Sequence, residues 1–278
     1  MHLHLARQWP RFALWAYCVG IFAFLILPLA IVVPVSFSSA QYLEFPPPGY
    51  STQWYASYFG DPEWIDATLL SLRVAATVVI LSVTMGLLAA MAIVRSPIPG
   101  KAVLRMLLMT PLIVPTIIVA IAVYSIYSDL HLVGSFWGIV LAHTILALPF
   151  TVMLMTSGLE RVDRRHEEAS FTMGASTWYT FRRVTLPALR PSLLAASVFA
   201  FVASWDEIVM VLFIGGETGL TLPLKMWSYL RTEINPTIAA VSTVLLTLVA
   251  TVFIAAEIYR ARRERRSIKS LRREPRAA

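Results

Sequence analysis

The stretch EEASFTMGASTWYTFRRVTLP, residues 167–187, decides how this chain is organised. It lies between two long apolar stretches and is too polar to cross a bilayer, yet its pattern is that of two short helices. The residues that start the first helix are Glu167, Glu168, Ala169 and Phe171. Gly174 can adopt the left-handed backbone conformation that ends it, and Ser176 can cap a second helix, which Leu186-Pro187 closes. We therefore expect a helix–turn–helix on a membrane surface, with side chains exposed to another protein.

The composition of the whole chain indicates that lipid is its solvent. Of the 278 residues, 58% are hydrophobic and only 14% are charged, against about one in four in a soluble globular domain. The mean hydropathy is +0.70, so the apolar side chains are too many for one core to hide from water. The single cysteine, Cys18, leaves no partner for an intrachain disulfide and no thiol pair for a metal or redox site.

Runs without Asp, Glu, Lys or Arg predict an all-α polytopic membrane protein with a single transmembrane domain over residues 1–278. A helix needs about 20 residues to cross a hydrocarbon core about 30 Å thick. We predict six such helices, roughly at 13–36, 67–94, 104–127, 135–157, 191–214 and 237–259.

The basic residues predict how these helices are oriented. The segment 36–66 has acidic residues but no Lys or Arg, whereas Arg95, Lys101 and Arg105 lie between the second and third helices. The loop 160–190 and the tail 260–278 are also rich in Arg. Because basic loops stay in the cytoplasm, both termini are expected there.

Two alternatives concern the ends of the chain. The first apolar run could be a secretory signal peptide, but it is about twice as long as the usual core of such a peptide. The basic tail could bind nucleic acid, but no aromatic residue interleaves with it after Tyr259. We expect no nucleic-acid partner, and a tail that sets the topology and contacts anionic lipid headgroups.

The spacing within the loop resembles the EAA loop of permease subunits in binding-protein-dependent ABC importers. Glu168-Ala169-Ser170 is followed after three residues by Gly174, and after nine more by Val184-Thr185-Leu186-Pro187. Ser170 replaces the usual second alanine. The resemblance implies a type I ABC importer permease fold in which residues 160–190, here named the coupling loop, dock into a groove on a cytoplasmic ATPase. The residues to which it gives this role are Glu168, Ala169, Gly174, Leu186 and Pro187; the alternative is an amphipathic loop that only orients the protein.

No motif for covalent or ATP chemistry is found. The chain lacks a G-x-x-x-x-G-K-[ST] phosphate-binding loop, so the energy must come from a partner, and we expect no cofactor and no enzyme activity. His166-Glu167 begins an H-E-x-x-H pattern, but Ser170 stands where the second zinc ligand would be. The lone His143 in the fourth span is expected to make an interhelical hydrogen bond.

Asp206 and Glu207 interrupt the fifth apolar run, and a carboxylate at that depth costs a few kcal/mol unless water or a partner meets it. Asp206 lies about 15 residues beyond Pro191, roughly 22 Å along a helix, beyond the midplane toward the outside. Because neighbours on a helix point about 100° apart, only one carboxylate can face a narrow pathway, and we expect Asp206. Trp205 offers an aromatic surface for an ammonium group. Alternatively, the pair holds helices together through Arg73 or a partner subunit.

The stretch 204–246 is similar to the carboxyl-terminal third of the permease subunits of spermidine and putrescine importers. The segments that carry this similarity are Asp206-Glu207, Gly215-Gly216, Thr221-Leu222-Pro223-Leu224 and Asn235-Pro236. The similarity implies an ATP-driven importer of polyamines or a similar organic cation in a bacterial inner membrane. In such an importer the chain pairs with a second permease subunit, two copies of a cytoplasmic ATPase and an external solute-binding protein.

Two other functions stay open. A permease for another small organic solute, such as an amino-phosphonate, would keep every feature of the coupling loop. An ATP-independent cation carrier or channel would need no such loop.

Overall fold

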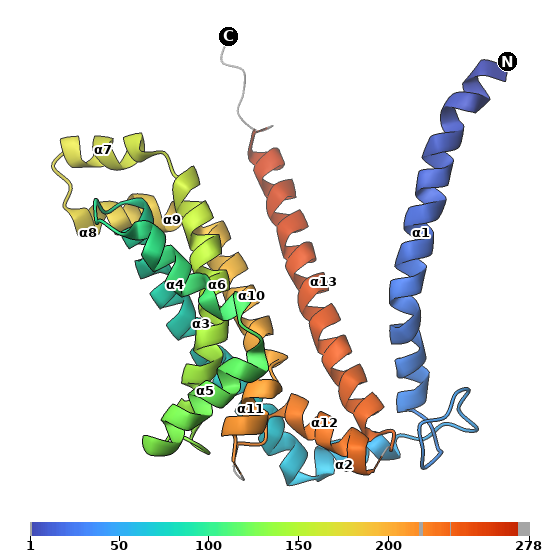
Figure 1. Ribbon diagram of the computed structural model, residues 1–278. Coiled ribbons are helices and arrows are strands. Elements are labelled where there is room, and N and C mark those ends of the chain that lie inside the picture. Colours follow the sequence, from blue (N-terminus) through green and yellow to red (C-terminus); the bar gives the residue numbers. More distant parts are fainter. Residues whose placement is uncertain (1, 217–218, 234, 272–278) are drawn as a thin grey trace. The chain divides into compact units, whose positions relative to one another are not determined.

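The computed structural model describes residues 2–216, 219–233 and 235–271, which are mostly helical (Figure 1). The chain forms two compact units, Met1–Pro62 with Tyr229–Ala278, and Glu63–Ser228. In the described ranges no strand is formed, and an isolated bridge joins Ser38 to Tyr50.

The first unit is built on two long helices, α1 (His2–Ser36) and α13 (Thr237–Leu271), which pack against each other. The short helix α2 (Gln53–Gly60) also packs on α13. The connection from α1 to α2 is held by hydrogen bonds. Trp54 Nε1 donates to the Ser38 carbonyl at 2.8 Å, and the hydroxyls of Tyr55 and Ser36 are 2.7 Å apart.

The second unit is a helical bundle centred on α6 (Phe136–Arg161) and α10 (Arg190–Trp205), which run side by side. Around them lie α3 (Pro62–Val94), α4 (Lys101–Ile113), α5 (Thr116–Asp129) and α11 (Val209–Ile214). Helix α12 (Leu222–Thr232) connects onward to the first unit's residues. The buried core that joins α3, α6, α10 and α11 consists of Val74, Val78, Ile139, Val140, Ala147, Ala200 and Val211.

Small residues let α3 and α6 approach closely. A Cβ atom added to Gly86 of α3 would lie 2.5 Å from Thr151 Oγ1 of α6. The same hydroxyl donates to the Ser82 carbonyl at 2.9 Å. Glycine contacts and interhelical hydrogen bonds are typical of helices that associate in lipid, where the hydrophobic effect contributes little.

Three helical stretches in the described ranges are long and apolar enough to span a membrane: Phe12–Ser36, Pro62–Val94 and Phe136–Arg161. They correspond to the first, second and fourth predicted spans. Two bent pairs bring the number to five if each pair is one span, and Thr237–Thr251 of α13 is a shorter apolar stretch. The count of six therefore stays a prediction that this structure is consistent with.

The third and fifth spans were wrongly expected to be continuous helices. Helices α4 and α5 meet at an angle of 106°, and the backbone is extended at Val114 and Pro115 between them. Proline lacks an N–H and disfavours a helical conformation in the residue before it, which explains this break. The fifth span breaks after Trp205, and α11 restarts at Val209.

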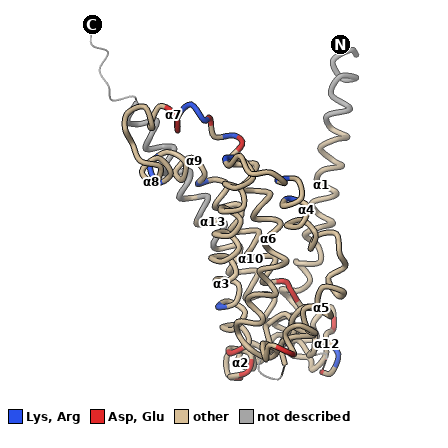
Figure 2. Tube along the Cα trace, turned by 60° about the vertical axis from the view of Figure 1, so that its left-hand side comes forward, with Lys and Arg blue, Asp and Glu red and all other residues tan. Residues whose placement is uncertain are grey.

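The charges of the second unit are unevenly distributed. Figure 2 shows most of its Lys and Arg at the end that carries α7, α8 and the start of α4. This asymmetry agrees with the basic loops found in the sequence. The predicted basic tail, 260–278, lies outside the described residues from position 272 onward.

Candidate ATPase-coupling loop and solute pathway

The first helix of the coupling loop, α7 (Arg164–Thr172), begins three residues earlier than predicted. The cause is Asp163, whose side chain accepts a hydrogen bond from the Arg165 amide at 2.9 Å and so caps the helix. The predicted turn is confirmed, because Gly174 has a φ of +81°. The Gly174 amide donates to the Phe171 carbonyl at 2.9 Å, which closes the helix end.

The second helix begins where the sequence predicts and ends later. The Ser176 side chain accepts from the Tyr179 amide at 3.3 Å and caps α8 (Thr177–Thr180). The helix continues as the π-helical segment η1 (Phe181–Thr185) and then α9 (Leu186–Ala188), so it ends one residue beyond the expected closure at Leu186-Pro187. The Leu186 amide bonds to the Phe181 carbonyl, five residues back, and this wider turn lets the chain pass through Pro187.

Two side-chain hydrogen bonds hold the halves of the loop together. Ser170 and Thr180 are both buried, and their hydroxyls are 2.9 Å apart. Thr185 Oγ1 donates to Glu167 Oε1 at 2.8 Å. Ser170, which stands where the resembled motif has alanine, is thus small enough for the site and adds a bond across the turn. These hydrogen bonds make the loop one folded unit and not a flexible connection.

The predicted coupling residues differ in exposure. Glu168 and Ala169 of α7 and Gly174 at the turn are exposed, whereas Leu186 and Pro187 are half-buried. The structure also exposes large apolar side chains that the sequence analysis did not assign to the contact. They are Phe171 at 47%, Met173 at 82%, Trp178 at 68% and Tyr179 at 55%. They could have been found in the sequence, because they are large apolar residues in an otherwise polar loop.

The acidic pair lies in the break between α10 and α11 and not on one helix. Asp206 is the residue that ends α10, and its side chain is exposed. Glu207 is half-buried, and its Oε1 accepts from the Met210 amide at 2.9 Å, so it caps the start of α11. The expected 100° separation on a continuous helix is therefore wrong, although the two carboxylates still have different surroundings. Trp205 is stacked on Phe201, with ring centroids 5.5 Å apart.

The alternative role of Arg73 as partner of the acidic pair finds no support in the described residues. Arg73 is exposed, and its Nε donates to the Leu69 carbonyl of its own helix at 3.3 Å. His143, in contrast, behaves as predicted. Its Nδ1 lies 3.0 Å from Ser204 Oγ, so a buried hydrogen bond joins α6 to α10.

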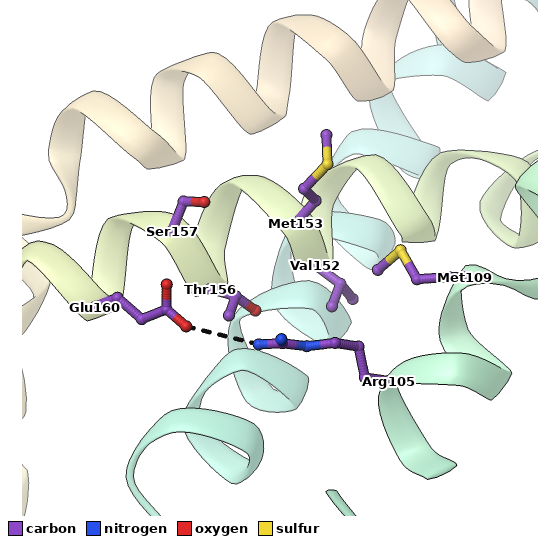
Figure 3. Close-up of a pocket in the computed structure, with 7 residues that line it drawn as sticks. All are labelled: Arg105, Met109, Val152, Met153, Thr156, Ser157 and Glu160. Atoms are coloured by element: carbon purple, nitrogen blue, oxygen red, sulfur yellow. Dashed lines mark ion pairs between the residues drawn. The ribbon is translucent and has the colours of Figure 1, made fainter. Parts of the chain in front are cut away.

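A cavity of about 210 Å³ opens beside the start of the coupling loop, between α4 and α6 (Figure 3). Its lining residues are Arg105, Met109, Val152, Met153, Thr156, Ser157 and Glu160. Arg105 and Glu160 face each other across it at 3.6 Å, and both side chains are about half exposed, at 52% and 55%. This ion pair is open to solvent and therefore weak.

Comparison with known proteins identifies the family of this chain. The family model for the inner membrane component of binding-protein-dependent transport systems matches residues 82–265, more than half of the chain. The chain belongs to this family. The resemblance found in the sequence is thereby confirmed: this is an ABC importer permease of an inner membrane, and not an enzyme.

The permease is similar over most of its length to curated relatives. It is 30% identical over 262 residues to the putrescine transport system permease protein PotI of Escherichia coli, covering 91% of this chain and 92% of PotI. It is 29% identical over 243 residues to the spermidine/putrescine permease protein PotC of Escherichia coli, covering 87% and 91%. The molybdenum permease protein ModB of Escherichia coli is 34% identical over 189 residues, 62% of this chain and 82% of ModB.

Solved structures confirm the fold. A chain of a bacterial ABC transporter involved in the import of alginate has a TM-score of 0.70 and 14% identity, covering 91% of this chain and 97% of that one. An inward-facing MetNI methionine transporter chain gives 0.53 and 20%, covering 70% and 92%. At these identities the likeness concerns the fold alone, and it agrees with the predicted all-helical ABC importer permease.

Proposed function

We propose that this permease is one of two membrane subunits of an ATP-driven importer of polyamines, such as putrescine and spermidine, or of a similar organic cation. Its partners are a second permease subunit, two copies of a cytoplasmic ATPase, an external solute-binding protein and the surrounding lipids. Residues 1–278 act as one transmembrane domain, the coupling loop 160–190 and the tail 260–278 face the cytoplasm, and both termini lie there.

The main support for the coupling role is the turn at Gly174, which hydrogen bonds hold in place. A left-handed glycine lets α7 and α8 fold back on each other, and the Ser170–Thr180 bond keeps them so. A rigid unit transmits a displacement that a flexible loop would absorb. Glu168, Ala169, Gly174, Leu186 and Pro187 form the contact with the ATPase. The exposed apolar side chains at Met173 and Trp178 extend it, because aromatic residues and methionine are enriched at protein interfaces.

The solute assignment is supported by the named relatives and by the acidic break in the fifth span. Asp206 is exposed and is an acidic side chain, the kind of group that recognises an ammonium ion. Trp205 presents an aromatic ring next to it. Glu207 is engaged in capping α11, so we assign Asp206 the direct contact with the cation and Glu207 a supporting place in the pathway.

Charge reversal tests the coupling role. In vesicles that contain the whole transporter, Glu168→Lys should abolish ATP-dependent uptake while the permease stays in the membrane. Asp129→Lys is the matched control, because Asp129 is exposed at the end of α5 and has no assigned role. Normal uptake by Glu168→Lys would remove the coupling assignment.

Neutralisation tests the solute pathway. Asp206→Asn should retain assembly and basal ATP hydrolysis but weaken uptake of putrescine and spermidine, with Asp129→Asn as the control. An unchanged uptake rate would leave Asp206 with a structural role only. Uptake of an amino-phosphonate in place of polyamines would change the solute and keep the transporter class, whereas uptake that survives loss of the ATPase would favour a carrier or channel.

A further inference from the structure

Arg95 makes a set of contacts that neither the family resemblance nor the sequence analysis assigned. It directly follows α3, and its side chain reaches the coupling loop. Its guanidinium Nη2 donates to the carbonyls of Leu159 and Val162 at 3.3 and 3.0 Å, and to Glu167 Oε1 at 3.4 Å. Nε lies 3.1 Å from Glu167 Oε2 as an ion-pair contact without hydrogen-bond geometry.

The Arg95–Glu167 pair is shielded from water. Each of the two side chains is only 13% exposed. Glu167 Oε1 also accepts from Thr185 Oγ1, so one carboxylate joins α7, η1 and the residue that follows α3. Charge interactions are stronger where water is excluded, and removing one partner leaves the other charge buried without an opposite charge beside it. The contacts therefore join the end of α3 to the end of α6 and to both halves of the coupling loop.

We propose that Arg95 is a positioning residue for transport, through which movement of the coupling loop is passed to α3. This inference rests on the proposed function, because it presumes that an ATPase moves the loop. The loop already continues covalently into α6 and α10, but α3 has no covalent link to it nearby. Arg95 supplies a non-covalent link in its place, since its planar guanidinium can hold two carbonyls and a carboxylate together in one geometry.

The second Arg–Glu pair at this end of the unit provides a matched control. Arg105 and Glu160 are 3.6 Å apart and about half exposed (Figure 3). Glu160 is the first residue of the coupling loop, and among the described contacts Arg105 touches no later residue of the loop. Loss of such an exposed pair changes little. Arg105→Gln therefore removes the same charge from the same end of the unit without removing the link to α3.

The experiment measures uptake and ATP hydrolysis together in vesicles that contain the permease, its partner permease, the ATPase and the external binding protein. The readout is solute imported per ATP hydrolysed, normalised to assembled complex. Arg95→Gln should lower this ratio by about tenfold, and Arg105→Gln should leave it within about twofold of the wild type. A role in folding alone would lower the amount of assembled complex and leave the ratio unchanged, and that result would overturn the inference.

A milder variant covers the case in which Arg95→Gln fails to assemble. Glu167→Gln retains an oxygen that can accept from Thr185 and leaves the two carbonyl bonds of Arg95, but it removes the ion pair. We expect its ratio to fall by about threefold. A wild-type ratio would refute the role of Arg95. If the unaltered complex showed no ATP-dependent uptake, the proposed function itself would fail, which is a distinct result.

Discussion

Replacing Gly174 by alanine isolates the backbone requirement of the coupling loop. The φ of Gly174 is +81°, and a Cβ atom built at this position meets no heavy atom within 4 Å. Alanine would therefore suffer no clash with neighbouring residues, and the whole cost comes from the left-handed conformation. That cost is about 1–2 kcal/mol for a residue with a Cβ atom.

This cost translates into a measurable loss of transport. A penalty of this size changes the ratio of bent to opened turns by a factor of about 5–30. The turn can open locally because Gly174 is exposed, although the Ser170–Thr180 bond opposes this. We expect uptake per assembled complex to fall in Gly174→Ala by up to this factor, and by less in Gly174→Asn, because asparagine tolerates this conformation better.

Gly100 provides the control for the same chemical change. Its φ is +76°, and it too has no heavy atom within 4 Å of an added Cβ, but it lies outside the coupling loop. Gly100→Ala should therefore transport at close to the wild-type rate in the same vesicle assay. Wild-type uptake by Gly174→Ala, or equal damage from alanine and asparagine, would refute the argument from backbone conformation.

Two further predictions concern stability in detergent, measured as the midpoint of thermal unfolding. Gly86→Val should lower the midpoint by about 5 °C, because the new side chain would overlap Thr151. In the control Gly20→Val, the added Cβ atom meets no heavy atom within 4 Å, so the midpoint should stay unchanged. Equal shifts in the two variants would disprove the close contact of α3 with α6. Glu63→Ala should cost about 3 kcal/mol, because it leaves the ammonium of Lys225, whose side chain is 4% exposed, without the carboxylate 3.0 Å away. Lys225→Met should cost only about 1 kcal/mol, since the Glu63 side chain is 80% exposed and stays hydrated, and the reverse order would contradict this account.

Features that depend only on residues adjacent in the sequence were predictable from it. The turn at Gly174 and the cap at Ser176 follow from the conformational freedom of glycine and the hydrogen-bonding capacity of serine, and both occur in the structure. The break of the third span also has a local cause, Pro115, but it was not predicted because the apolar run continues through this residue. The break at Asp206 was missed because the carboxylate of Glu207 was considered for its charge and not as a cap.

The sequence by itself determined that the chain is a helical membrane protein and that a bent polar loop lies between its spans, because composition, periodicity and turn chemistry are properties of short segments. Only the tertiary structure decided which side chains meet. Arg95 and Glu167 are 72 residues apart, and Glu63 and Lys225 are 162 apart. Such contacts depend on how α3, α6 and α12 pack, and no local pattern specifies which of many charged residues becomes buried beside another.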